Sequence, residues 1–134
     1  MSQTIAERMA EDAANAVTLT EEYFTKRLDF SEESVQLVEE LVDDMHYTLP
    51  QGKTPQNVAL LSELWGAYIG EVFRRNVGGE WITWEDQWGK APAIALGGTK
   101  IFPQDKVRKR FTNGPEDNLW HYYQTFRDLL SSQQ

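Results

Sequence analysis

Apolar residues recur in adjacent pairs every four positions from Pro55 to about Asn76, which is the spacing of one buried helical face. Between these pairs stand small residues in the middle of the segment and charged residues at its two ends. Each helical glycine costs about 1 kcal/mol relative to alanine. We therefore expect a central helix buried on two sides, whose smooth face lets a neighbouring backbone approach closely; a ligand site is the alternative. The small residues of this face are Gly66, Ala67 and Gly70.

Two weaker helical patterns precede the central helix. The first, from about residue 3 to residue 17, is alanine-rich and has few large apolar residues. It predicts a loosely docked or fraying helix over residues 1–17, and Thr20 is expected to cap a short second piece. The other pattern starts at Ser31, whose side chain is expected to cap an acidic helix that ends before Pro50.

Strand patterns follow the central helix. The segment EWITW, Glu80 to Trp84, is rich in aromatic and β-branched residues and predicts a strand. In PAIALGGTKIFP, two short runs flank Gly97–Gly98, which predicts a hairpin with a two-residue turn at positive φ. We expect Pro92 and Pro103 to bound this hairpin. The three strands would form an antiparallel meander whose first connection is the seven-residue EDQWGKA.

The chain ends in two further helical patterns. The first stops at Asn113–Gly114, and Pro115 is expected at the first position of the last helix. The order of elements predicts an α+β fold in a single domain, 1–134. N-terminal helices and the central glycine-containing helix would pack with a small three-stranded antiparallel meander, followed by two C-terminal helices.

Composition limits the function classes. The 134 residues include no cysteine, which excludes disulfides and zinc–thiolate sites. Residues 1–67 hold 13 acidic against 4 basic residues (net −9), and residues 68–134 hold 8 against 9 (net +1), which sum to −8. An acidic chain repels phosphate backbones, so we expect no nucleic-acid partner. With no apolar run of membrane-spanning length and no signal-peptide pattern, we expect a cytoplasmic protein without membrane contacts.

Residues suited to catalysis or metal binding are few. His121 shares a helical face with Asp117 and Asp128, which is a weak pattern for a metal site. His46 stands near the end of the acidic helix, where a surface or capping role is expected. Neither GGEW nor LGGTK opens a helix, as a phosphate-binding loop does. We expect no metal, no cofactor and no catalytic residue, and favour a binding protein over an enzyme.

The acidic helix is a candidate partner surface. Two of its aspartates stand near its C-terminus, where each negative charge costs about 0.3–1 kcal/mol against the helix dipole. A helix that only keeps the protein soluble does not need acids at unfavourable positions. The candidates for binding a basic protein partner are Glu39, Glu40, Asp43 and Asp44. A plain solubility surface is the alternative.

Cations and tryptophans gather after the central helix. The segment KVRKRF, residues 106–111, forms a basic cluster together with Lys100. We expect it to bind a phosphate-bearing ligand or to pair with acidic residues, either of this chain or of a second copy in a homodimer. Trp88 is the candidate for an exposed anchor, because it stands in the connection EDQWGKA. A pocket for an anion would combine Arg74, Arg75, Trp84 and Trp88.

One resemblance rests on the segments LWGAYIGEVFRRNVGGEW, PAIALGG and FPQDKVRKRFTNGPEDNL. Over about residues 28–130, the sequence resembles small stand-alone bacterial domains of unknown function. The resemblance implies a bacterial cytosolic origin and carries no activity, cofactor or catalytic residue. Small acidic domains without cysteine include toxin-neutralising immunity proteins, which is an analogy rather than a motif match.

Two functions from different classes follow from these patterns. The first is a non-enzymatic protein-interaction domain, of immunity or inhibitor type, that binds a basic partner through the acidic helix. The second is a binder of a small anionic ligand, or a weak enzyme, that uses the arginine–tryptophan pocket. From the sequence, we favour the first.

Overall fold

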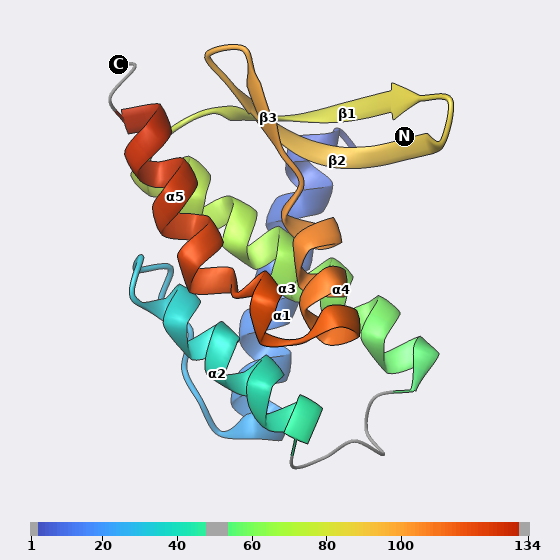
Figure 1. Cartoon of the computed structure of the whole chain (residues 1–134), viewed down its shortest axis with the longest axis vertical. Coiled ribbons are helices and arrows are strands. Elements are labelled where there is room, and N and C mark those ends of the chain that lie inside the picture. The colour runs from blue at the N-terminus through green and yellow to red at the C-terminus, as the bar shows by residue number, and fades with distance from the viewer. Residues whose placement is uncertain (1–2, 48–53, 132–134) are drawn as a thin grey trace.

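The computed structural model describes residues 3–47 and 54–131. In these residues the chain has the predicted α+β fold, with helices at both ends and an antiparallel three-stranded sheet between them. Figure 1 shows the sheet across one end of the helices, with α3 running through their middle. The elements are α1 (Ile5–Phe24), α2 (Ser34–Tyr47), α3 (Pro55–Asn76), β1 (Glu80–Asp86), β2 (Gly89–Leu96), β3 (Thr99–Ile101), α4 (Pro103–Asn113), the 3₁₀ turn η2 (Pro115–Asp117) and α5 (Leu119–Ser131).

Helix α3 is the centre of the fold, and residues 64–73 are buried without interruption. The smooth face of α3 is occupied by two neighbours. A Cβ added at Gly66 would lie 2.3 Å from the Cα of Gln104 in α4, and one at Gly70 would lie 2.2 Å from Cη2 of Trp81 in β1. Ala67, between them, is fully buried. The two glycines therefore stand where larger side chains would push α4 and β1 away from α3.

Helix α1 corrects the prediction of a loose segment followed by a second short helix. It is continuous and packs along α3. Thr20 lies inside it, fully buried, and its Oγ1 accepts a hydrogen bond from Nε1 of Trp65 at 3.0 Å. Met9, Ala13 and Ala16 are also fully buried. Alanines allow α1 to lie close to α3, so a pattern judged by large apolar residues underestimates this contact.

Helix α2 begins slightly later than predicted. The Oγ of Ser31 accepts a hydrogen bond from the backbone N–H of Ser34 at 3.2 Å, which is the expected capping contact. Residues 32 and 33 form a turn, and the regular helix starts at Ser34. Its inner face is buried through Val35, Val38 and Val42.

The second hairpin has the predicted turn. Leu96 pairs with Thr99, and the two glycines between them have φ values of 56° and 83°. The first hairpin differs from the prediction, because β1 extends to Asp86 and β2 begins at Gly89. Its connection is therefore two residues long rather than seven. Pro92 lies within β2 and does not bound the hairpin. The missing N–H of Pro92 costs no hydrogen bond to β3, because β3 pairs only with residues 94–96 of β2.

The C-terminal helices follow the prediction except at one boundary. Helix α4 ends at Asn113, and Gly114 follows with a φ of 92°. Pro115 begins η2 rather than α5. Helix α5 is instead capped by Asn118, whose Oδ1 accepts a hydrogen bond from the N–H of His121 at 2.9 Å. In the described part of the chain, no helix combines the length and apolar character required to cross a bilayer.

Candidate functional site

A hollow of about 620 Å³ lies between the first hairpin and the start of α4. Figure 1 shows that the tip of this β1–β2 hairpin extends to one side beyond the helices. Strands β1, β2 and β3 and helix α4 all contribute side chains, so the hollow exists only in the folded chain. We call it the hairpin hollow. Its aromatic and charged lining consists of Trp84, Trp88, Phe102, Lys90, Lys100, Arg108, Asp86 and Asp105.

Strand pairing brings the first tryptophan and lysine together. Trp84 stands opposite Ala91 in β2, whose small side chain leaves room on this face of the sheet. Lys100 in β3 and Phe102, which follows the strand, stand on either side of Ile101, which faces the core and is buried. The Nζ of Lys100 lies 4.8 Å from the centroid of the Trp84 ring, within the range of a cation–π interaction.

Asp86 holds the tip of the hairpin. Its Oδ1 accepts a hydrogen bond from the backbone N–H of Trp88 at 2.8 Å, and its Oδ2 accepts one from Nε1 of Trp84 at 3.2 Å. One carboxylate therefore holds the indole of Trp84 and the backbone of Trp88. The Trp88 side chain remains 85% exposed, as expected from its place in the connection. A tryptophan this exposed is unusual, because tryptophans are mostly buried in cores or interfaces.

One cation on the Trp84 face of the hairpin hollow has no ion-pair partner in the described residues. Asp105 pairs with Arg108, and its Oδ2 lies 3.2 Å from Nζ of Lys109. Burial raises the pKa of Asp105, but the hydrogen bonds from Arg108 and Lys109 outweigh it and hold the pKa below its usual value. Within residues 3–47 and 54–131, Lys90 and Lys100 form no ion pair. Lys90 stands opposite Glu85 in the hairpin register and lies on the opposite face of the sheet from Trp84. On the Trp84 face, Arg108 is paired with Asp105, and Lys100 is the cation of the lining that has no ion pair in the described residues.

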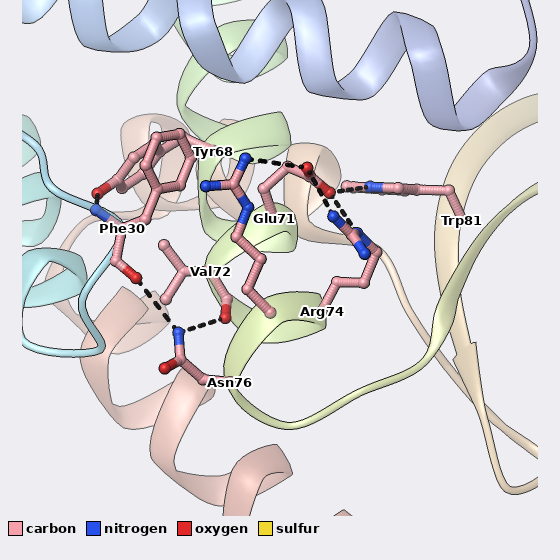
Figure 2. A network of polar contacts seen from close by, with 8 residues as sticks. Phe30, Tyr68, Glu71, Val72, Arg74, Asn76 and Trp81 are labelled. Atoms are coloured by element: carbon pink, nitrogen blue, oxygen red, sulfur yellow. Dashed lines mark hydrogen bonds and ion pairs between the residues drawn. The ribbon is translucent and has the colours of Figure 1, made fainter.

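In the described residues, Arg74 and Arg75 have partners other than the two tryptophans of the predicted pocket. Figure 2 shows the Glu71 carboxylate between Arg74 and the indole of Trp81. Glu71 is 1% exposed, and its Oε2 accepts hydrogen bonds from Nε of Arg74 at 2.7 Å and from Nε1 of Trp81 at 2.9 Å. Nη2 of Arg75 lies 3.6 Å from Oε1 of Glu71, and Cζ of Arg75 lies 3.8 Å from the centroid of the Phe30 ring. Arg74 and Arg75 therefore hold neighbouring elements on α3, while Trp84 and Trp88 line the hairpin hollow without them.

Replacing Glu71 by Gln is expected to lower the free energy of unfolding by about 1.5–3 kcal/mol at neutral pH. Burial raises the pKa of Glu71, but Arg74, Trp81 and Arg75 hold it below the ordinary value of 4.5. A carboxyl with a lowered pKa stabilises the fold above its ordinary pKa, and this contribution is lost as the pH falls through the folded-state pKa. As the pH falls below the ordinary pKa of a glutamate, the free energy of unfolding of the Glu71→Gln variant should therefore decrease less than that of the wild type.

Urea unfolding at a series of pH values from neutral into the acid range measures this difference. Glu80→Gln, at an exposed carboxylate of β1, is the matched control and should follow the wild type. If Glu71→Gln loses as much stability in acid as the wild type does, the role assigned to Glu71 is wrong.

The acidic helix is partly engaged within the chain. Arg110 of α4 is completely buried and donates hydrogen bonds to Glu39 at 2.8–3.0 Å and to Asp43 at 2.6 Å. One member of the basic cluster therefore pairs with the acidic half of the same chain, which was one of the two expectations for it. Glu40 and Asp44 are exposed on α2. Of the four candidate partner-binding residues, two are thus committed to Arg110.

The weak metal pattern around His121 is not assembled. Among residues 3–47 and 54–131, no group of three or more potential ligands lies close enough to hold a metal ion. Asp117 pairs instead with Lys106 at 2.7 Å and accepts a hydrogen bond from Asn113 at 2.8 Å. The side chain of His46 lies outside the described residues.

A comparison with protein families shows which family the chain belongs to. Residues 42–123 match the family described as a domain of unknown function, DUF3806, and this match covers more than half of the sequence. The chain belongs to this family. The matched range of this DUF3806 protein contains every residue named in the lining of the hairpin hollow. Among curated proteins, no sequence matches the chain.

One solved structure has a similar fold. It is the crystal structure of a protein from Bacteroides thetaiotaomicron VPI-5482 at 1.50 Å resolution, with a TM-score of 0.70 and 18% sequence identity. The similarity covers 96% of this chain and 46% of that one, so the present chain spans less than half the length of its structural neighbour. At this identity, the similarity concerns the fold alone.

Sequence reasoning missed part of the hollow of this DUF3806 protein. The sequence patterns single out Trp84, Trp88, Lys100 and the 106–111 cluster, but as separate features. A two-residue first connection pairs Trp84 with Ala91, the small residue that leaves room for the hollow, and a seven-residue connection does not predict this pairing. The signal for the arginines was also present, because Glu71, Arg74 and Arg75 have the i, i+3 and i, i+4 spacings of helical ion pairs.

Proposed function

We propose that this protein is a non-enzymatic binding domain that takes an anionic ligand in the hairpin hollow. The observation that carries the proposal is that one hollow is lined both by an exposed tryptophan, Trp88, and by Lys100, a lysine without an ion pair in the described residues. A volume of about 620 Å³ lies within the range of roughly 300–1,000 Å³ typical of small-molecule sites. A bacterial, cytoplasmic setting belongs to the proposal and rests on the sequence resemblance and the lack of cysteine.

A basic protein partner bound by α2, as in an immunity or inhibitor protein, is the second candidate. The exposed carboxylates of Glu40 and Asp44 support it. It is weakened by Glu39 and Asp43, because both already neutralise a buried arginine. A partner would have to compete with Arg110 for them, so the hairpin hollow is the better supported site.

Replacing Lys100 by Gln is expected to weaken anion binding about tenfold, because a hydrogen bond to a charged group contributes about 1.5–3 kcal/mol. The probes are benzoate, 3-phenylpropionate, succinate and inorganic phosphate, followed by quenching of tryptophan fluorescence and by thermal shift. At least one organic anion should quench fluorescence and raise the Tm of the wild type, because binding to the native state stabilises it.

The matched control is Lys26→Gln, at an exposed lysine outside the lining of the hollow. This variant should bind as the wild type does. If none of the four anions binds the wild type, or if the Lys100 and Lys26 variants bind equally, the proposed function is wrong.

A further inference from the structure

The two tryptophans of the hairpin hollow are not equivalent. The Trp84 ring is half-buried, carries Lys100 at 4.8 Å from its centroid and donates its N–H to Asp86. Trp88 is 85% exposed, and its side chain has no ring or cation contact with the described residues. A ligand ring that approached Trp84 would have to displace Lys100. Trp88 is therefore the surface on which a flat apolar group can stack.

The unpaired lysine that lines the same hollow, Lys100, is restrained. The contact of Lys100 with Trp84 limits the positions of a long, flexible side chain, so its ammonium group is held at one place in the hollow. A group bound by a restrained side chain loses less entropy than one bound by a freely moving lysine. Lys100 is thus prepared to receive an acidic group whose attached ring lies on Trp88.

The number of unpaired cations limits the charge of the ligand. On the Trp84 face of the hairpin hollow, Arg108 is paired with Asp105, and Lys100 is the cation of the lining that has no ion pair in the described residues. A smaller hollow of about 170 Å³ adjoins it and shares Lys100, Phe102 and Asp105. Its additional cations, Lys106 and Lys109, are already paired with Asp117 and Asp105. A second acidic group on the ligand would therefore meet no unpaired cation in the smaller hollow.

We infer that the ligand of the hairpin hollow is an aromatic monoanion, whose ring stacks on Trp88 and whose acidic group binds Lys100. This inference rests on the proposed function and specifies its ligand class. A polyphosphate or a nucleic-acid strand carries several negative charges and does not fit a site with one unpaired cation. A free aromatic acid and the C-terminal aromatic residue of another chain share the inferred chemistry.

Calorimetric titration with three matched compounds tests the inference. They are 3-phenylpropionate, its neutral amide 3-phenylpropionamide, and 3-cyclohexylpropionate, which keeps the acid and loses the aromatic ring. The phenyl acid should bind about tenfold more tightly than the amide and about three- to tenfold more tightly than the cyclohexyl acid. The Trp88→Ala variant should lose the preference for the phenyl over the cyclohexyl acid and keep the preference for the acid over the amide. The Lys100→Gln variant should keep the preference for the phenyl ring and lose the preference for the acid.

The control for Trp88 is Tyr23→Ala, which removes an aromatic side chain that is 74% exposed and does not line the hollow. It should leave both preferences unchanged. Equal affinities of the phenyl and cyclohexyl acids, with Lys100→Gln still weakening both, would overturn the aromatic ligand class and leave the proposed function intact. If both acids and benzoate fail to bind while succinate or phosphate still binds, the inference is overturned and the proposed function stands. If none of these anions binds, both proposals are overturned.

A peptide that ends in phenylalanine distinguishes the two sources of the inferred group. The peptide Gly-Gly-Gly-Gly-Phe with a free carboxylate is compared with its C-terminal amide and with 3-phenylpropionate. Tighter binding of the free peptide assigns the site to a chain terminus, and tighter binding of 3-phenylpropionate assigns it to a free acid. Equal binding of the peptide and its amide, together with no preference for 3-phenylpropionate over its amide, would overturn the inference.

Discussion

Replacing Arg110 by alanine is expected to lower the free energy of unfolding by about 3–5 kcal/mol. The side chain is completely buried and bonds to Glu39 through Nε and an Nη, and to Asp43 at 2.6 Å. Glu39 is only 12% exposed and also accepts the backbone N–H of Leu119 at 2.8 Å. Alanine would leave this carboxylate without its cation at the junction of α2, α4 and α5.

Urea unfolding followed by tryptophan fluorescence measures the effect. Arg108→Ala is the matched control, because Arg108 lies on the same helix with a 57% exposed side chain; it should change stability by about 0.5 kcal/mol or less. The double variant Glu39→Met, Arg110→Met should regain much of the loss, because it leaves no buried charge unpaired. If Arg110→Ala costs no more than Arg108→Ala, the buried arginine does not hold these helices together.

Replacing Gly66 by alanine is expected to destabilise the fold by about 1–3 kcal/mol or more, despite the higher helix propensity of alanine. The added Cβ would lie 2.3 Å from Cα and 2.7 Å from the backbone N of Gln104. That backbone belongs to α4, and Nε2 of Gln104 donates a hydrogen bond to the carbonyl of Glu63 at 3.0 Å. Because the contact is with backbone, α4 as a whole must move. Leucine at this position should cost more than alanine.

Gly70→Ala tests the same surface against a side chain. Its Cβ would lie 2.2 Å from Cη2 and 2.3 Å from Cζ2 of Trp81, a ring held by its hydrogen bond to Glu71. Trp81→Phe removes those ring atoms, so it should partly relieve Gly70→Ala, whereas Gln104→Ala should not relieve Gly66→Ala. Thermal melts of the single and double variants measure this. Unchanged Tm in both single variants would mean that α3 is not packed so closely by α4 and β1.

Elements with a strong local signal were predictable, and elements held by distant contacts were not. The turn over Gly97–Gly98 requires positive φ at two successive residues, which glycine supplies, so its position follows from the sequence. Helix α1 was underestimated because its contact with α3 is made largely by Ala13, Ala16 and Thr20. Their burial depends on a close approach of two helices, which the pattern of one segment does not contain.

The sequence predicts which types of residue line the site, but not which of these residues come together in it. Two indoles near a connection are conspicuous in the sequence, so Trp84 and Trp88 are easily singled out. The contact of Lys100 with Trp84 depends on the pairing of three strands, which the local pattern does not contain. Closeness along the chain favours a pocket that joins Arg74 and Arg75 to these tryptophans, but both arginines pair with Glu71 on their own helix. The burial of Glu71 is produced by packing of Trp81 from β1, a contact between separate elements.

The indole N–H signals of the five tryptophans, recorded in a nitrogen–proton correlation spectrum as 3-phenylpropionate is added, test most directly whether the hairpin hollow is the binding site. Trp65 and Trp81 are buried and bonded to Thr20 and Glu71, and Trp120 stacks on Tyr123 in α5. We predict that the signals of Trp84 and Trp88 move together with one dissociation constant, while the other three stay in place. Movement of the Trp120 signal, with Trp84 and Trp88 unchanged, would contradict the assignment of the hollow as the binding site.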